Sequence, residues 1–181
     1  MPQRIHITGA SGAGTTTLGE HLARKLGCAH FDTDNFFWLP TDPPFQTKRD
    51  ALERLRLLTA ALSENDQFVL SGSLDGWGDP LIPLFTAVIF LDTPTEIRLA
   101  RLRHREAIRF GRQAIEPGGK FHDHHREFLD WAASYDDGSM AGRSRRRHEA
   151  WLARLDCPVI RARGDQPLER LLAEIAARIA G

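Results

Sequence analysis

Three glycines lie close together in TGASGAGTTT, residues 8–17. Gly9, Gly12 and Gly14 give this segment the spacing G-x-x-x-x-G-x-T, between an apolar run and a helix-like run. Such glycines let the backbone turn so that successive amides point inward at phosphate oxygens, and the following helix adds the partial positive charge of its N-terminus. We therefore predict a phosphate-binding loop, whose nucleotide-binding residues are Gly9, Ser11, Gly12, Ala13, Gly14, Thr15, Thr16 and Thr17.

One position of this loop departs from the usual motif. In a Walker A loop, a lysine precedes the Ser or Thr that binds Mg²⁺. Here Thr16 holds the position of the metal-binding hydroxyl, and Thr15 that of the lysine. The chain has lysines only at Lys25, Lys48 and Lys120, so we expect phosphate contacts to come mainly from arginine side chains and backbone amides.

Two aspartates follow the second apolar run of the chain. Asp32 and Asp34 flank Thr33 in AHFDTD, at the carboxyl end of an expected strand, which is the edge where open α/β sheets bind ligands. Residues two apart in an extended chain point the same way, so both carboxylates can face the loop. The pattern favours a functional pair over two carboxylates that only bind nearby backbone.

The elements that must position these residues alternate between strands and helices. The apolar runs predict five strands, at about residues 4–8, 29–34, 67–71, 87–92 and 158–162. Leucines at helical spacing and glycine stops predict four helices, at about residues 16–27, 48–62, 95–105 and 168–180. The alternation predicts right-handed βαβ units and an α/β fold with a parallel sheet covered on both faces. Residues 1–181 are expected to form one domain.

Residues 106–147 fit this alternation poorly. The segment is polar, contains PGGK and DDGSMAG, and has little apolar periodicity apart from FLDWA. A segment this long outside the core is more often a functional lid than an idle loop, so we expect a lid here. The histidines of FHDHH, residues 121–125, match no structural zinc pattern and are assigned to a polar lid helix.

Residues 35–80 are expected to form an acceptor pocket. The aromatic side chains of NFFW follow Asp34 directly, and one of the rings could cover a substrate, although packing in the core is an equal alternative. Three arginines on the next expected helix could bind an acceptor phosphate: Arg49, Arg54 and Arg56.

Bulk properties narrow the class of protein. With 24 Lys+Arg and 24 Asp+Glu, the formal net charge is zero, which gives no general attraction to nucleic acid or to a membrane surface. Cys28 and Cys157 form no CxxC motif, which indicates a reduced, cytoplasmic protein. We expect neither a signal peptide nor a membrane span, because few residues precede the first strand and no apolar run is long enough.

The segment GASGAGTTTLGEHLARKLGCAHFDTD, residues 9–34, resembles the opening of the small P-loop kinases, which include adenylate, cytidylate and shikimate kinases. Archaeal-type cytidylate kinases also carry threonine in place of the loop lysine. The resemblance covers residues 4–34 closely and 86–105 in part, and elsewhere it concerns only the architecture. It implies a P-loop NTPase three-layer sandwich, with a five-stranded parallel sheet in the order 2-3-1-4-5 and a polar lid insertion. It also implies ATP and Mg²⁺ as cofactors.

The resemblance suggests roles for the acidic pair and for the first arginines of the lid. Thr16 and Asp32 would hold Mg²⁺, and Asp34 would orient or deprotonate the acceptor. Arg101 and Arg105, in the arrangement R-L-x-x-R, would contact adenine and neutralise the transferring phosphoryl group. Their spacing places both on one helical face.

Other basic residues of this region are assigned differently. Arg98 and Arg103 are expected on a solvated helix face. At the far end of the lid, Arg143 is the expected catalytic residue, and with Arg146 and Arg147 it could swing onto the phosphates when the lid shuts. Lys120 is a further candidate.

The expected function is that of an ATP-dependent small-molecule kinase, with a nucleoside monophosphate as the leading acceptor. SGSLDGWGDP, residues 71–80, lacks the arginine that adenylate kinases carry there, which counts against that acceptor. We expect a monomer or homodimer that binds a nucleotide and a small acceptor, and neither nucleic acid nor membrane.

Three other interpretations stay open. One is a non-catalytic ATP- or ADP-binding sensor. A second is an NAD(P)-binding enzyme, because TGASGAGT also resembles the glycine turn of short-chain dehydrogenases, although Thr15 replaces its last glycine and Ser139 replaces the lysine expected four residues after Tyr135. The third is a glycine-rich turn that binds nothing.

Overall fold

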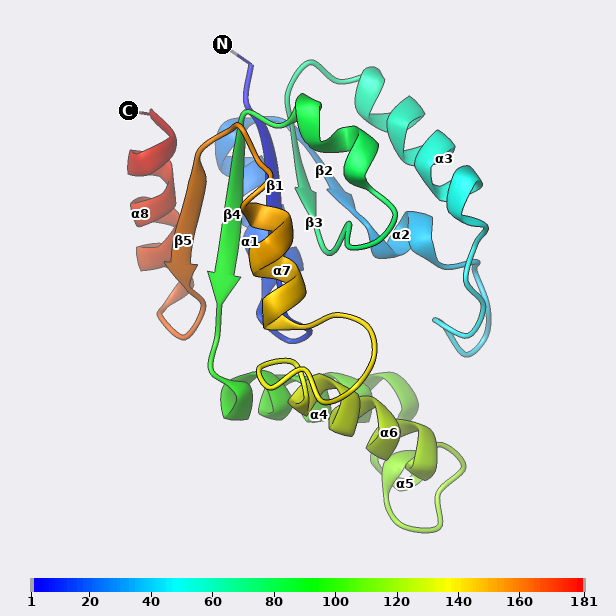
Figure 1. The fold of residues 1–181 in the computed structure, drawn as a ribbon. Helices are drawn as coiled ribbons and strands as arrows, with labels where there is room; N and C mark the ends of the chain where they lie inside the picture. The colour runs from blue at the N-terminus through cyan, green and yellow to red at the C-terminus, as the bar shows by residue number, and fades with distance from the viewer. Residues whose placement is uncertain (1, 181) are drawn as a thin grey trace.

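The computed structural model describes residues 2–180 and has a parallel five-stranded sheet at its centre (Figure 1). The strand order is β2-β3-β1-β4-β5, which confirms the order expected from the sequence. The strands are β1 (Arg4–Gly9), β2 (Ala29–Asp32), β3 (Phe68–Ser71), β4 (Ala87–Asp92) and β5 (Val159–Arg163). Strand β3 lies between β2 and β1, whereas β2 adjoins β1 in the usual dinucleotide-binding sheet. The order therefore disfavours the NAD(P)-binding interpretation.

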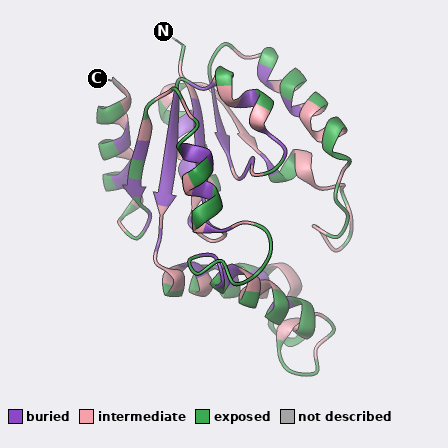
Figure 2. Ribbon diagram, viewed as in Figure 1, coloured by how far each residue is buried: buried purple, intermediate pink, exposed green. Residues whose placement is uncertain are grey.

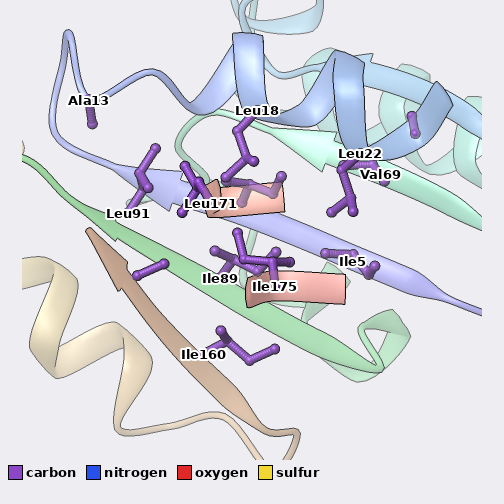
Figure 3. Close-up of a cluster of buried hydrophobic side chains, with 13 residues drawn as sticks. Ile5, Ala13, Leu18, Leu22, Val69, Ile89, Leu91, Ile160, Leu171 and Ile175 are labelled. Carbon is purple, nitrogen blue, oxygen red and sulfur yellow. The ribbon is translucent and has the colours of Figure 1, made fainter. Parts of the chain in front are cut away.

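Apolar side chains cover both faces of the sheet, because successive residues of a strand point to opposite sides. On one face, α1 (Thr15–Leu26) and α8 (Leu168–Ala180) pack against the sheet (Figure 3). In that cluster Leu18 and Leu22 of α1 and Ile175 of α8 meet Ile5 and Ile89. Full burial of each such side chain stabilises the fold by about 1.5–3 kcal/mol, and it fixes the start of α1 relative to the end of β1.

The opposite face is covered by α3 (Ala51–Ser63), η1 (Asp79–Leu84) and α7 (Arg145–Leu152). Helix α3 begins at Ala51, three residues later than expected, because the Asp50 side chain accepts hydrogen bonds from the amides of Leu52 and Glu53 and caps the helix there. Leu58 and Leu62 join the core, whereas Leu52, at the solvent side of the same helix, is 79% exposed.

The expected lid segment is mainly helical. Helix α4 (Thr95–Phe110) extends five residues beyond the expected end, and α5 (Arg112–Ile115) and α6 (His122–Ala133) follow it. These helices lie beyond the carboxyl edge of the sheet (Figure 1), and most of their residues are exposed or half-buried (Figure 2). Helix α6 includes most of FHDHH, so the expected helix is present, while the function of residues 106–147 as a lid stays a prediction. Over residues 2–180, no helix has the length and apolar character that a bilayer span requires.

Candidate active site

The glycine loop connects β1 to α1 at the carboxyl edge of the sheet. Gly12 and Gly14 adopt φ angles of 80° and 101°, the left-handed region that favours glycine. A Cβ on Gly12 would lie 2.6 Å from the carbonyl oxygen of Arg98, so the loop can approach α4 this closely only with glycine there. Gly14 is the N-cap of α1 and makes no side-chain cap, which leaves the first-turn amides available to a ligand.

A cleft of about 840 Å³ opens in front of this loop. Six of the eight predicted nucleotide-binding residues line it: Ser11, Gly12, Gly14, Thr15, Thr16 and Thr17. Gly9 lies behind the loop against Leu91, and Ala13 lines a smaller hollow of about 260 Å³. The cleft therefore combines an uncapped helix N-terminus with three threonines, the surroundings expected of a phosphate group.

Asp32 is held in place by hydrogen bonds to both of its carboxylate oxygens. The Thr16 hydroxyl donates to Oδ2 at 2.7 Å, and the Asp34 amide donates to Oδ1 at 2.9 Å. Behind them, Ser71 Oγ lies 3.4 Å from the same Oδ2 and 2.9 Å from His30 Nε2. A hydroxyl beside a carboxylate is the hard oxygen donor set that Mg²⁺ prefers, so the residues present fit the metal expected from the sequence.

Asp34 begins α2 (Asp34–Phe37) and its side chain lines the cleft. Partial desolvation within the cleft and the negative charge of Asp32 raise the pKa of this carboxyl, whereas Arg143 and Arg105 oppose the rise. A carboxylate with a raised pKa binds a proton more readily, which suits a general base. The structure thus brings the two predicted aspartates and Thr16 together at one end of the cleft.

The three arginines predicted to be catalytic all line the cleft, but they have different hydrogen-bond partners. Arg105 and Arg143 line the cleft close to Asp34, and partial desolvation within the cleft lowers the pKa of both guanidinium groups. Arg143 also lies over the Trp131 ring, 5.9 Å from its centroid. The guanidinium group of Arg101 donates instead to two backbone carbonyls, Ala13 O at 3.1 Å and Gly164 O at 2.9 Å, so it holds the loop in place.

Arg98 does not lie on a solvated face. It is 1% exposed, because α6 covers this side of α4, and it donates to the carbonyls of Thr93 and Ala132 at 3.1 Å each. Its guanidinium group also reaches the carbonyl of Ser11 in the glycine loop at 3.4 Å. The sequence prediction was wrong for Arg98, whereas Arg103 is exposed as expected.

Arg109 is a cleft residue that the sequence analysis missed. It lies 4.5 Å from the centroid of the Phe45 ring and pairs with Glu106 at 3.0 Å. It continues the four-residue spacing of Arg101 and Arg105, and a longer prediction for α4 would have found it. Phe45 had no comparable signal, because it lies in an irregular loop.

Several other candidates lie outside the cleft. Arg49 donates to the Phe36 carbonyl, Arg54 lies over the Phe37 ring, and Arg56 pairs with Glu53. The remaining basic candidates, Lys120, Arg146 and Arg147, are exposed and do not line it. Among the aromatic residues, Trp38 lines the cleft, while Phe36 and Phe37 pack against the core.

Comparison with known proteins agrees with this arrangement. A family model described as AAA domain matches residues 5–116, which span the glycine loop, the aspartates and α4. The chain belongs to this AAA domain family. A protein of Bacillus subtilis (strain 168), described as uncharacterized protein YqaC, is 46% identical over 165 residues, covering 91% of this chain and 90% of that protein.

Solved structures share the fold of this AAA domain protein. A shikimate kinase from Acinetobacter baumannii, in complex with shikimate, aligns over 99% of this chain and 94% of its own with a TM-score of 0.60 and 17% identity. A gluconokinase from Sinorhizobium meliloti 1021 aligns over 99% and 92% with a TM-score of 0.57 and 17% identity. The chain therefore has the fold of the small P-loop kinases, as its resemblance to them implied.

Proposed function

We propose that the protein is an ATP-dependent phosphotransferase that moves the γ-phosphoryl group of ATP to a hydroxyl group of a small acceptor. The observation that carries this proposal is the group formed by Thr16, Asp32 and Asp34 beside an uncapped helix N-terminus. Phosphoryl transfer needs little covalent chemistry from a protein, because positioning and compensation of charge supply most of the rate enhancement. We assign both the positioning of the reactants and the compensation of charge to groups that line the cleft.

The proposed reaction assigns one task to each group. The first-turn amides of α1 would bind the β- and γ-phosphates, as helix N-termini bind anions. Asp34 would accept the proton of the acceptor hydroxyl, whose oxygen forms a bond to the γ-phosphorus while the bond to the bridging oxygen of ADP breaks. Arg105 and Arg143 would neutralise charge on the transferring group.

Thr16 and Asp32 are the residues that would hold Mg²⁺ in this proposal. The metal ion, when bound, neutralises negative charge on the phosphates. The hydrogen bonds from Thr16 and from the Asp34 amide already orient the Asp32 carboxylate, so its direction depends on the chain and not on a ligand.

A nucleoside monophosphate is the first acceptor to test. Trp38 and Phe45 provide rings on which a base can stack, and Arg109 provides a guanidinium group for a phosphate. Shikimate, which the similar Acinetobacter protein binds, is the second compound to test.

The test is ADP release from ATP and Mg²⁺ with a panel of nucleoside monophosphates, shikimate and small sugars. Turnover with one acceptor supports the proposal. In that assay, Asp34→Asn should lower kcat by roughly 10²–10⁴-fold while ATP affinity stays nearly unchanged. Asp66→Asn is the matched control, because Asp66 is an exposed carboxylate that precedes β3 at the opposite edge of the sheet.

Two outcomes would contradict the proposal. ATP binding without turnover on any acceptor would indicate the nucleotide sensor. Full turnover of Asp34→Asn would show that another group accepts the proton.

A further inference from the structure

The segment 143–147, RSRRR, places neighbouring arginines in different surroundings. Arg143 lines the cleft beside Asp34, whereas Arg145 and Arg147 form ion pairs with Asp92 of β4 and with Asp75, which follows β3. Arg145 Nη2 lies 2.7 Å from Asp92 Oδ1, at the carboxyl end of β4. Asp92 is the last residue of β4, so this ion pair ties this end of the expected lid to the central sheet.

A second carboxylate extends the attachment of Arg145. Its Nε lies 2.8 Å from Oδ1 of Asp136, which follows α6. Asp136 also accepts hydrogen bonds from the Thr95 hydroxyl and from buried Arg98, at 3.1 Å for the latter. Because Arg98 in turn reaches the Ser11 carbonyl, one continuous network joins the glycine loop, the start of α4 and the segment that carries Arg143.

Further hydrogen bonds and an ion pair hold the same segment. The Arg145 amide donates to the Tyr135 carbonyl at 2.8 Å, and Ser144 caps α7 by accepting from the Arg147 amide. Arg147 binds both carboxylate oxygens of Asp75, at 2.9 and 3.0 Å. Residues 144–147 are thus attached to β4, to the segment that follows α6 and to the loop after β3. Arg143 is the residue immediately before them.

We infer that Arg145 is a positioning residue, whose ion pairs with Asp92 and Asp136 hold Arg143 in the cleft beside Asp34. The inference rests on the proposed phosphoryl transfer and assigns Arg145 a role in it without contact with substrate. The sequence suggested that Arg143 swings onto the phosphates when the lid shuts. In this inference, its guanidinium group already lies in the cleft before the reaction. A group that is held in position before the reaction avoids the entropy cost of being ordered during it.

The first experiment is a double-mutant cycle on kcat. Arg145→Gln should lower kcat roughly 10- to 100-fold, with the KM for ATP nearly unchanged, because small displacements of a charged group near the reacting atoms have effects of this size. In an Arg143→Gln background, Arg145→Gln should have almost no further effect, since it acts only through Arg143. Arg154→Gln is the matched control: it removes an Arg–Asp ion pair of 2.8 Å, with Asp79, that lies away from the cleft.

Two results of the cycle would overturn the inference. One is an Arg145→Gln kcat equal to that of Arg154→Gln. The other is an equal loss of kcat whether or not Arg143 is present, which is the result of a purely structural role. If Arg145→Gln does not fold, Arg145→Lys keeps the charge but cannot bridge two carboxylates with a fork of donors, and the same cycle is run with it.

A second experiment does not depend on turnover. The Trp131 indole donates to the Ala141 carbonyl at 3.2 Å and lies under Arg143, so its N–H resonance reports where that guanidinium group is. Trp131→Phe identifies the resonance among the four tryptophans. In Arg145→Gln this resonance should move toward its position in Arg143→Gln, and in Arg154→Gln it should not.

The two experiments separate the inference from the proposed function. An unmoved Trp131 resonance in Arg145→Gln overturns the positioning role, whatever the activity. A moved resonance in a protein that phosphorylates no acceptor supports the positioning of Arg143 and contradicts the proposed function.

Discussion

Two buried histidines should make the fold unstable in mild acid. His6 and His148 are 0% and 2% exposed, between the sheet and α7. Each has one partnered ring nitrogen: His6 Nδ1 lies 3.1 Å from the Leu70 carbonyl oxygen, and His148 Nδ1 lies 2.8 Å from the Tyr135 hydroxyl. Neither Nε2 atom has a hydrogen-bond partner among residues 2–180.

Burial lowers the pKa of both histidines from 6.5 to about 3. Arg143, Arg145 and Arg147 lower the pKa of His148 further, while Glu149 opposes them. A folded-state pKa below the unfolded value means that the unfolded chain binds more protons, so stability is full above about pH 6.5 and falls as the pH drops toward 3.

The loss of stability can be calculated from the protons that the unfolded chain binds at these two histidines and the folded protein does not. Each histidine costs about 1.4 kcal/mol per pH unit below 6.5, so the pair costs roughly 5 kcal/mol between pH 6.5 and 4.5. This loss is comparable to the whole stability of many domains, about 5–15 kcal/mol. We therefore expect the midpoint of urea unfolding to fall steeply over this interval.

The assay is urea unfolding followed by far-ultraviolet circular dichroism at several values of pH. His148→Gln removes one titrating group and keeps a partner for the Tyr135 hydroxyl, so it should reduce the slope of unfolding free energy against pH by about one proton, or roughly 1.4 kcal/mol per pH unit. His104→Gln, at an exposed position of α4, should leave the slope unchanged. A slope in His148→Gln equal to that of the wild type would refute the reasoning.

Three further predictions concern the loop, the metal site and the core. Gly12→Ala should lower stability by about 1–3 kcal/mol and weaken ATP binding, measured by thermal unfolding with and without ATP, because its Cβ would lie 2.6 Å from the Arg98 carbonyl oxygen at a φ of 80°. Asp32→Asn should raise the Mg²⁺ concentration needed for half-maximal activity about 10-fold or more, and an unchanged Mg²⁺ titration would remove this residue from the metal site. Leu58→Ala should lower the free energy of unfolding in urea by about 2–5 kcal/mol, since the side chain is fully buried, and a loss below 1 kcal/mol would contradict its burial in the core.

The parts of the fold that depend on residues close together in the chain could be predicted from the sequence. The apolar run AVIFLD was expected at 87–92, and β4 spans Ala87–Asp92 because both faces of this strand are covered. The start of α3 was also present as a signal, since Asp50 and Glu53 have the spacing of a capping pattern.

The errors concern contacts between segments far apart in the chain. Arg98 meets Asp136, 38 residues later, because α6 folds back over α4. Helical spacing shows which side chains share a face, but it does not show whether another helix covers that face. For the same reason the sequence placed Arg101 and Arg105 together without showing that carbonyl groups already bind Arg101.

These contacts indicate which residues could supply the positive charge that the loop lacks at Thr15. Thr15 lines the cleft, and Arg101, the arginine that approaches nearby Gly14, already has the carbonyls of Ala13 and Gly164 as acceptors. Arg105 and Arg143 also line the cleft, and a guanidinium group stays protonated at neutral pH even where desolvation lowers its pKa. Under the proposed function these two supply the charge that a loop lysine supplies elsewhere. Because they come from opposite ends of the segment 105–143, that charge depends on how this segment is attached to the sheet.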